Sequence, residues 1–162
     1  MSAALAPSPS SVRLAQLPPL ALYVHMPWCA KKCPYCDFNS HRATGDVPER
    51  AYVDALVTDL ELALPDVWGR RVSSVFFGGG TPSLFSAVAI ETLISAFRAR
   101  LPLAADCEIT LEANPGTFEA EKFRGYREAG VNRLSIGIQS FNPKHLLALG
   151  RIHDDAEARR AI

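Results

Sequence analysis

Three of the four cysteines of this sequence stand within eight positions, in the segment HMPWCAKKCPYCDFNSH. Their spacing is Cys29-x3-Cys33-x2-Cys36. Three thiolates are able to bind three irons of a [4Fe–4S] cluster, which leaves the fourth iron open to a substrate or cofactor. The alternative is zinc, which in structural sites takes four protein ligands. His25 or His41 would then be the fourth, so the spacing alone leaves both metals open.

The composition is that of an ordinary globular chain. It has 162 residues, of which 48% are hydrophobic and 21% charged, which is enough for one domain with a core. Lys and Arg number 17, as do Asp and Glu, so no basic surplus indicates a nucleic-acid partner. No apolar stretch approaches the ~20 residues needed to span a bilayer. We expect a cytoplasmic protein without a transmembrane segment.

The N-terminal segment differs from the rest of the chain. Residues 1–18 are rich in Ala, Ser and Pro, and no basic segment precedes an apolar one. We therefore expect a mobile leader rather than a signal peptide, with the domain covering residues 19–162. Without export the thiols are expected to stay reduced. A tight thiol group in such a chain is more typical of a metal or catalytic site than of a disulfide framework.

Short apolar segments alternate with longer amphipathic ones along the domain. The predicted strands cover residues 20–25, 72–77, 107–113 and 132–138, and the predicted helices cover residues 48–64, 87–100 and about 119–129, before a last helical stretch. This alternation predicts βαβ units with a parallel sheet. Four such units are about half of a closed eight-stranded barrel. We expect an α/β fold that forms the N-terminal part of a TIM-like (β/α) barrel, truncated at its C-terminus.

Unusual residues follow each predicted strand. The cysteine loop follows the first strand, and GGGTP, EANPG and GIQSF stand at the ends of the next three. In a parallel α/β fold these segments meet at one rim, where such folds bind ligands. The glycines either allow a close backbone approach to a ligand or form a tight turn before a helix. The remaining apolar strand residues are assigned to the core: Phe76, Phe77, Cys107, Leu111 and Ile136.

The cysteine spacing with the glycine-rich turn resembles the radical S-adenosylmethionine (SAM) enzymes. LYVHMPWC, GGGTPS, EANPG and NRLSIGIQSF are similar, more narrowly, to the family of oxygen-independent coproporphyrinogen III oxidase and the heme chaperone HemW. The resemblance implies a radical SAM barrel whose [4Fe–4S] cluster is held by the three cysteines and whose open iron binds SAM. The implied contacts near cluster and SAM are Tyr23, Tyr35, Gly78, Gly79, Gly80, Thr81, Glu112, Gln139 and Arg151.

One position separates the two branches of that family. The oxidase branch carries an extra cysteine two residues after the third ligand, where this sequence has Phe38. The resemblance therefore favours the HemW branch, which implies heme as cargo and hemoprotein acceptors such as respiratory-chain proteins, with transient membrane-protein contact. The alternative is oxidative decarboxylation of coproporphyrinogen III by a radical SAM oxidase. A zinc-stabilised binding module without redox chemistry is the third hypothesis.

Overall fold

The computed structural model describes residues 15–115 and 120–162. The leader predicted over residues 1–18 lies largely outside these ranges. In chain order the elements are β1 (Leu20–Met26), β2 (Trp28–Cys29), β3 (His41–Arg42), α1 (Glu49–Val67), β4 (Val72–Gly79), the 3-10 helix η1 (Pro82–Leu84), α2 (Ala87–Arg100), β5 (Leu103–Ala113), α3 (Ala120–Ala129), β6 (Arg133–Ile136), α4 (Pro143–Ala148) and α5 (Asp155–Arg160).

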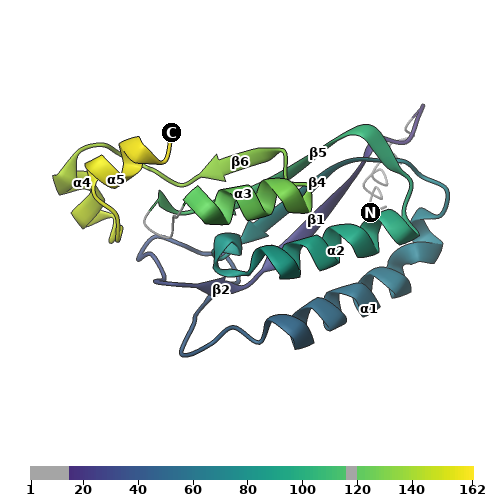
Figure 1. Cartoon of the computed structure of the whole chain (residues 1–162), viewed down its shortest axis with the longest axis horizontal. Coiled ribbons are helices and arrows are strands. Elements are labelled where there is room, and N and C mark those ends of the chain that lie inside the picture. Colours follow the sequence, from purple (N-terminus) through teal and green to yellow (C-terminus); the bar gives the residue numbers. More distant parts are fainter. Residues whose placement is uncertain (1–14, 116–119) are drawn as a thin grey trace, which may run out of the picture.

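Four strands form one parallel sheet in the order β1-β4-β5-β6, which is also their order in the chain. The helices α1, α2 and α3 lie on one face of it, and α4 and α5 lie beyond the carboxyl ends of the strands (Figure 1). The predicted α/β class with a parallel sheet is confirmed. Because the connections are single helices between neighbouring strands, all four carboxyl ends meet at one edge.

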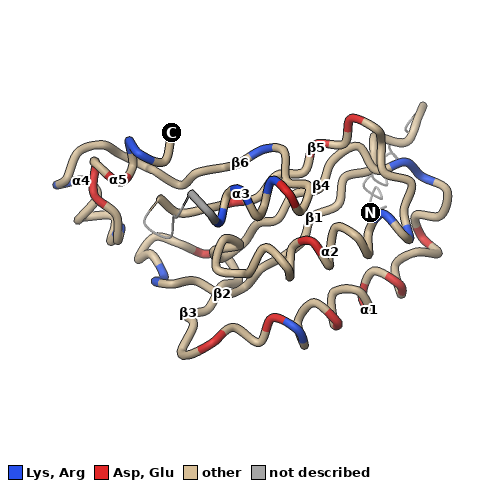
Figure 2. The backbone as a smooth tube through the Cα atoms, viewed as in Figure 1, with Lys and Arg blue, Asp and Glu red and all other residues tan. Residues whose placement is uncertain are grey.

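The register of the strands shows which residues lie side by side at that edge. Met26 of β1 pairs with Gly79 of β4, and Ala113 of β5 pairs with Ile136 of β6. The predicted cysteine, glycine, EANPG and GIQSF segments therefore all begin at this edge. Basic and acidic residues are interspersed along the backbone rather than gathered in one part of it (Figure 2).

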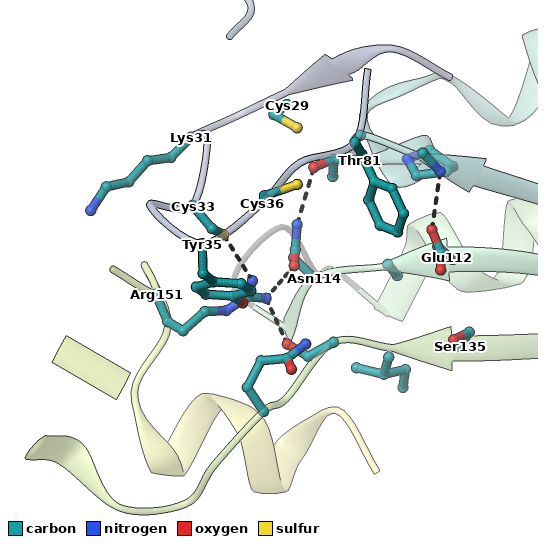
Figure 3. Close-up of a pocket in the computed structure, with 18 residues that line it drawn as sticks. Cys29, Lys31, Cys33, Tyr35, Cys36, Thr81, Glu112, Asn114, Ser135 and Arg151 are labelled. Atoms are coloured by element: carbon teal, nitrogen blue, oxygen red, sulfur yellow. Dashed lines mark hydrogen bonds between the residues drawn. The ribbon is translucent and has the colours of Figure 1, made fainter. Parts of the chain in front are cut away.

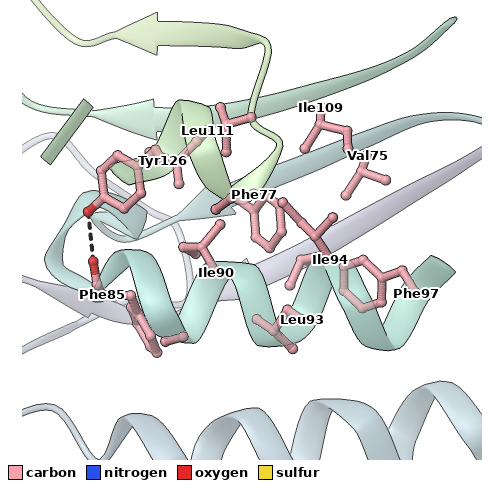
Figure 4. Close-up of a cluster of buried hydrophobic side chains, with 14 of the residues drawn as sticks. Val75, Phe77, Phe85, Ile90, Leu93, Ile94, Phe97, Ile109, Leu111 and Tyr126 are labelled. Carbon is pink, nitrogen blue, oxygen red and sulfur yellow. Dashed lines mark hydrogen bonds between the residues drawn. The ribbon is translucent and has the colours of Figure 1, made fainter. Parts of the chain in front are cut away.

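The core lies between the sheet and the helices. Ile90, Ile94 and Phe97 of α2 meet a row of buried strand side chains that includes Phe77, and Leu93 lies on the side of α2 toward α1 (Figure 4). We call the sheet face that packs on α1, α2 and α3 the covered face; its strand residues are Val24, Met26, Val75, Phe77, Cys107, Ile109, Leu111 and Ala113. All of them are buried. Burial of this apolar surface is the main term that stabilises the layers.

The opposite side of the sheet, the open face, carries no helix in the described part of the chain (Figure 1). Its strand residues include Tyr23, His25, Phe76, Glu112 and Ser135. Tyr23 is 57% exposed and stacks on Phe76, with ring centroids 6.3 Å apart.

Two core assignments were wrong in detail. Phe77 and Leu111 are fully buried, but Phe76 and Ile136 are only half-buried. Successive strand residues point to opposite faces, so Phe76 lies on the open face beside Tyr23. Ile136 stands at the last position of β6 and faces the pocket described below.

The element boundaries moved only slightly from the predicted ones. β5 begins at Leu103, so the buried Cys107 lies inside the strand rather than at its start. The predicted last helical stretch is two short helices, each with a side-chain N-cap: Asn142 for α4 and Asp154 for α5. No helix in the described ranges is both long and apolar enough to cross a bilayer.

Candidate functional site

The cysteine loop is closed at its base by the small β2–β3 pair. Trp28 and Cys29 pair in parallel with His41 and Arg42. The Ala43 N–H donates to the Cys29 carbonyl over 2.9 Å. The two ends of the loop, at Cys29 and at His41–Arg42, are thereby held together. All four cysteines of the sequence are free thiols.

Trp28 anchors this base in the core. Its ring meets Tyr52 edge-on at 4.7 Å between centroids and lies 5.8 Å from Phe85. Cys29, the next residue, is buried, whereas Cys33 and Cys36 are half-buried. Aromatic packing therefore fixes the first cysteine, and the other two stand on the more exposed part of the loop.

His25 has both ring nitrogens engaged. Nε2 donates to the Asn39 carbonyl over 2.8 Å, and Nδ1 lies 3.1 Å from the Tyr23 hydroxyl, which donates to it. The imidazole ties the far end of the cysteine loop to β1. These contacts leave no ring nitrogen of His25 available as the fourth ligand of a zinc site.

The glycine segment is packed against the protein itself. The Gly80 and Thr81 N–H groups donate to the Met26 and Trp28 carbonyls, each over 2.7 Å. A Cβ on Gly80 would lie 2.5 Å from the Trp28 carbonyl oxygen. Gly79 has φ +115°, and its Cβ would lie 2.6 Å from His25 Nδ1. The glycines are therefore needed for the chain's own contacts, a reason that the sequence did not reveal.

One pocket of about 290 Å³ opens where the four strand ends meet. Figure 3 shows the thiols of Cys29, Cys33 and Cys36 together on one side of it, with Glu112 and Ser135 on the other. The predicted site residues in its wall are Cys29, Cys33, Tyr35, Cys36, Gly79, Gly80, Thr81, Glu112, Gln139 and Arg151. Tyr23 and Gly78 lie beside the pocket on the open face, in contact with each other: a Cβ on Gly78 would lie 3.0 Å from the Tyr23 ring.

Arg151 joins several of the loops around this pocket. Nη1 donates to Cys33 Sγ over 3.3 Å, and Nη2 donates to the Gly137 carbonyl over 2.6 Å and to Asn114 Oδ1. Asn114 Nδ2 in turn donates to Thr81 Oγ1 over 3.1 Å. One guanidinium and one amide thus connect the ends of all four strands (Figure 3).

Glu112 and Tyr35 are the titratable groups of the pocket with altered pKa values. Burial raises the pKa of the Glu112 carboxyl, while a hydrogen bond from the Gly79 N–H, at 3.2 Å, opposes the change. Partial burial, and then the adjacent Cys33 thiol, raise the pKa of Tyr35, and Arg151 acts against this. Both groups belong to a partly dehydrated cavity.

The ligand arrangement bears on the choice between zinc and a cluster. Within residues 15–115 and 120–162, no group of three or more His, Cys, Asp or Glu side chains is placed to hold a single metal ion. A zinc ion needs its ligands around one point, whereas a cubane cluster takes each thiolate on a different iron. Three free thiols in the wall of one cavity can supply the thiolates that a cluster takes.

Sequence reasoning missed some residues of the pocket. Asn114, Ser135, Gly137 and Phe38 line it, and none of them was assigned a role there. The position directly after a strand was the available signal for Asn114. Gly137 opens the GIQSF segment after β6, but no sequence signal shows that its missing side chain makes room for Arg151 Nη2, Gln139 Nε2 and Asn114 Oδ1.

Comparison with known sequences and structures gives consistent matches. The sequence model of the Radical SAM superfamily matches residues 23–162. The chain is 58% identical over 148 residues to "Heme chaperone HemW" of Escherichia coli (strain K12), covering 91% of this chain and 39% of that protein. It is 52% identical over 153 residues to the HemW of Haemophilus influenzae (strain ATCC 51907 / DSM 11121 / KW20 / Rd), covering 92% and 40%.

Among solved structures, coproporphyrinogen III oxidase (HemN) from Escherichia coli, described as a radical SAM enzyme, matches with a TM-score of 0.78 and 34% identity. The match covers 86% of this chain and 32% of that one. The chain spans well under half the length of all three relatives. A four-stranded parallel α/β sheet with this coverage agrees with the predicted part of a radical SAM barrel.

Proposed function

This chain belongs to the radical SAM superfamily, and from that premise we propose that it forms the cluster- and SAM-binding part of a heme chaperone similar to HemW. The observation that carries the proposal is the high identity to HemW proteins in a chain whose pocket is walled by three free thiols. The family implies a [4Fe–4S] cluster and SAM; heme as cargo is the further step.

The proposed roles divide the pocket in two. Cys29, Cys33 and Cys36 hold the cluster. A cluster held by these thiols would supply the electron for reductive cleavage of SAM. The thiols fit that group, because three free thiols stand in one wall of the pocket and thiolates are the ligands that such a cluster takes.

The remaining wall is proposed to hold SAM. Gly79 and Gly80 present backbone without side chains to the cavity, and Thr81, Glu112, Gln139 and Arg151 supply polar groups. Tyr35 covers the site beside Cys33. Tyr23 and Gly78 are proposed to support this wall from outside the pocket, since they pack against each other on the open face.

The cargo, acceptors and location follow the proposal. Heme is bound and passed to hemoprotein acceptors such as respiratory-chain proteins, with transient contact to membrane-bound ones, in the cytoplasm. No role in nucleic-acid binding is proposed, in keeping with the balanced charge of the sequence.

A second candidate is oxidative decarboxylation of coproporphyrinogen III. It is favoured by the likeness to the solved structure of HemN. The residue at the branch position weighs against it: Phe38, an exposed phenyl ring in the pocket wall, replaces the thiol of the oxidase branch.

The test separates the two functions in one preparation. The protein is purified without oxygen, its cluster is reconstituted and verified by absorption, and it is loaded with heme. We expect heme transfer to an apo-hemoprotein acceptor and no protoporphyrinogen when coproporphyrinogen III, SAM and reductant are supplied. Turnover of coproporphyrinogen III without heme transfer would replace the proposal by the oxidase function. Failure of both reactions with an intact cluster would contradict both.

A further inference from the structure

Arg151 has a position that binding of SAM alone does not explain. Its Nη1 donates to Cys33 Sγ over 3.3 Å, although the two residues are 118 positions apart. The guanidinium is held there by Gly137 O and Asn114 Oδ1, on the ends of two other strands. Its Nε is buried and has no hydrogen-bond partner within the described residues. The cation is therefore fixed at a thiol sulfur by several loops at once.

The sulfur environments of Cys33 and Cys36 differ. Cys33 Sγ receives a charge-assisted hydrogen bond from Arg151. The polar contact of Cys36 Sγ is the Ser40 hydroxyl, at 4.0 Å, which is a weak and neutral interaction. Of these two thiols on the exposed part of the loop, Cys33 thus carries the only cationic partner in the described structure.

The segment that carries Arg151 is itself anchored. Two residues on, His153 is buried and its Nε2 donates to the Ile138 carbonyl over 3.1 Å. Arg151 and His153 therefore hold two successive residues of the loop after β6, Gly137 and Ile138, from one short segment. This double contact restricts the guanidinium to the neighbourhood of Cys33.

We propose that Arg151 is a positioning residue that raises the reduction potential of the cluster through its contact with the Cys33 sulfur. A reduced cluster carries one more negative charge than an oxidised one. Hydrogen bonds and positive charge at the ligand sulfurs stabilise the reduced form. This inference rests on the proposed cluster site and adds to it a residue that acts on the cluster through one of its ligands.

The experiment is a redox titration of the anaerobically reconstituted protein, followed by electron paramagnetic resonance and carried out without SAM. Arg151→Gln is expected to move the midpoint potential to a more negative value by at least about 59 mV, a tenfold change in a one-electron equilibrium. Arg151→Lys, which keeps the charge, is expected to lie closer to wild type than Arg151→Gln. Arg160→Gln removes the same charge from an exposed position of α5 and is expected to leave the potential unchanged.

A second variant moves the guanidinium without removing it. A Cβ on Gly137 would lie 3.2 Å from Arg151 Nη2 and 3.3 Å from Asn114 Oδ1, closer than side chains normally approach. Gly137→Ala is therefore expected to shift the potential in the same direction by a smaller amount. This variant decides the matter if Arg151→Gln does not retain iron.

The outcomes are distinct. A wild-type protein that forms no iron–sulfur cluster overturns the proposed function and this inference with it. A wild-type cluster whose potential is the same in Arg151→Gln overturns this inference alone. An equal shift in Arg160→Gln also overturns it, because the effect would then be one of net charge. A potential in Arg151→Lys as low as that of Arg151→Gln does so too, because the charge would then have no effect.

Discussion

The two faces of the sheet are built from alternating residues of the same strands, but one forms the core and the other carries groups of the site. The covered face is a continuous apolar layer that joins the strands to α1, α2 and α3. The open face carries Tyr23, His25 and Glu112, each held by a polar contact within the site region. One face gains stability from burial, and the other places groups that a ligand can reach. The comparison predicts that mutations on the covered face lower stability, whereas mutations on the open face and at the rim change the site.

The comparison is sharpest for two cysteines. Cys33→Ala is expected to abolish cluster assembly, because one of three thiolate ligands is lost. Cys107→Ala, on the covered face, is expected to retain a full iron complement, since that thiol is a small buried group of β5. Iron and sulfide analysis after anaerobic reconstitution measures both. Equal iron content in the two variants would contradict the assignment of Cys33 to the site and of Cys107 to the core.

Two adjacent phenylalanines provide the next test. Phe77 is fully buried on the covered face, and Phe76 is half-buried on the open face. Phe77→Ala is expected to lower the free energy of unfolding by about 3–5 kcal/mol. Phe76→Ala is expected to cost about 1–2 kcal/mol, because less apolar surface is lost from burial. Denaturant unfolding of the protein compares them, and an equal loss would show that the open face is as tightly packed as the covered one.

The rim has its own matched pair, made of two glycines. Gly80→Ala would place a Cβ 2.5 Å from the Trp28 carbonyl oxygen, so the base of the cysteine loop must shift. We expect a loss of roughly 1–3 kcal/mol in stability, together with reduced iron content. Gly45→Ala meets nothing within 4 Å and is the control. If Gly80→Ala has the same melting temperature and iron content as Gly45→Ala, the glycine segment does not pack closely against the base of the cysteine loop.

The smallest expected effect is a pH dependence on the open face. Burial raises the pKa of Glu112 above its usual 4.5 in the folded state. The folded protein therefore binds the proton more tightly than the unfolded chain, and stability falls as the pH rises from about that value through the raised pKa. Glu112→Gln should remove this loss: its melting temperature should exceed that of wild type at pH 7 and equal it at low pH. A difference that grows towards acid would have the wrong sign.

Much of this arrangement was predictable from local patterns. The four strands and three helices follow from the alternation of short apolar and longer amphipathic segments, which is a property of neighbouring residues. The pocket follows from unusual residues after each strand, because parallel strands end at one edge. The functional division of the faces was harder to predict, since both Phe76 and Phe77 are apolar and only the helices decide which is buried.

Contacts between residues far apart in the chain could not be predicted from the sequence. The family resemblance implied that Arg151 is a polar contact of SAM, but nothing in the sequence indicated that it reaches Cys33. Likewise, Tyr23 and Gly78 stand beside the pocket rather than in its wall, because they pack on each other across β1 and β4. Such pairs depend on the register of the sheet and on loop geometry, which periodicity does not encode.

The most direct test of the account is the metal content of the protein reconstituted without oxygen. The account predicts about four iron and four sulfide ions per chain, lost in Cys33→Ala, with a paramagnetic signal on reduction that changes when SAM is added. One zinc ion per chain, with no iron, no colour and no response to SAM, would contradict it and leave the thiols as a structural metal site.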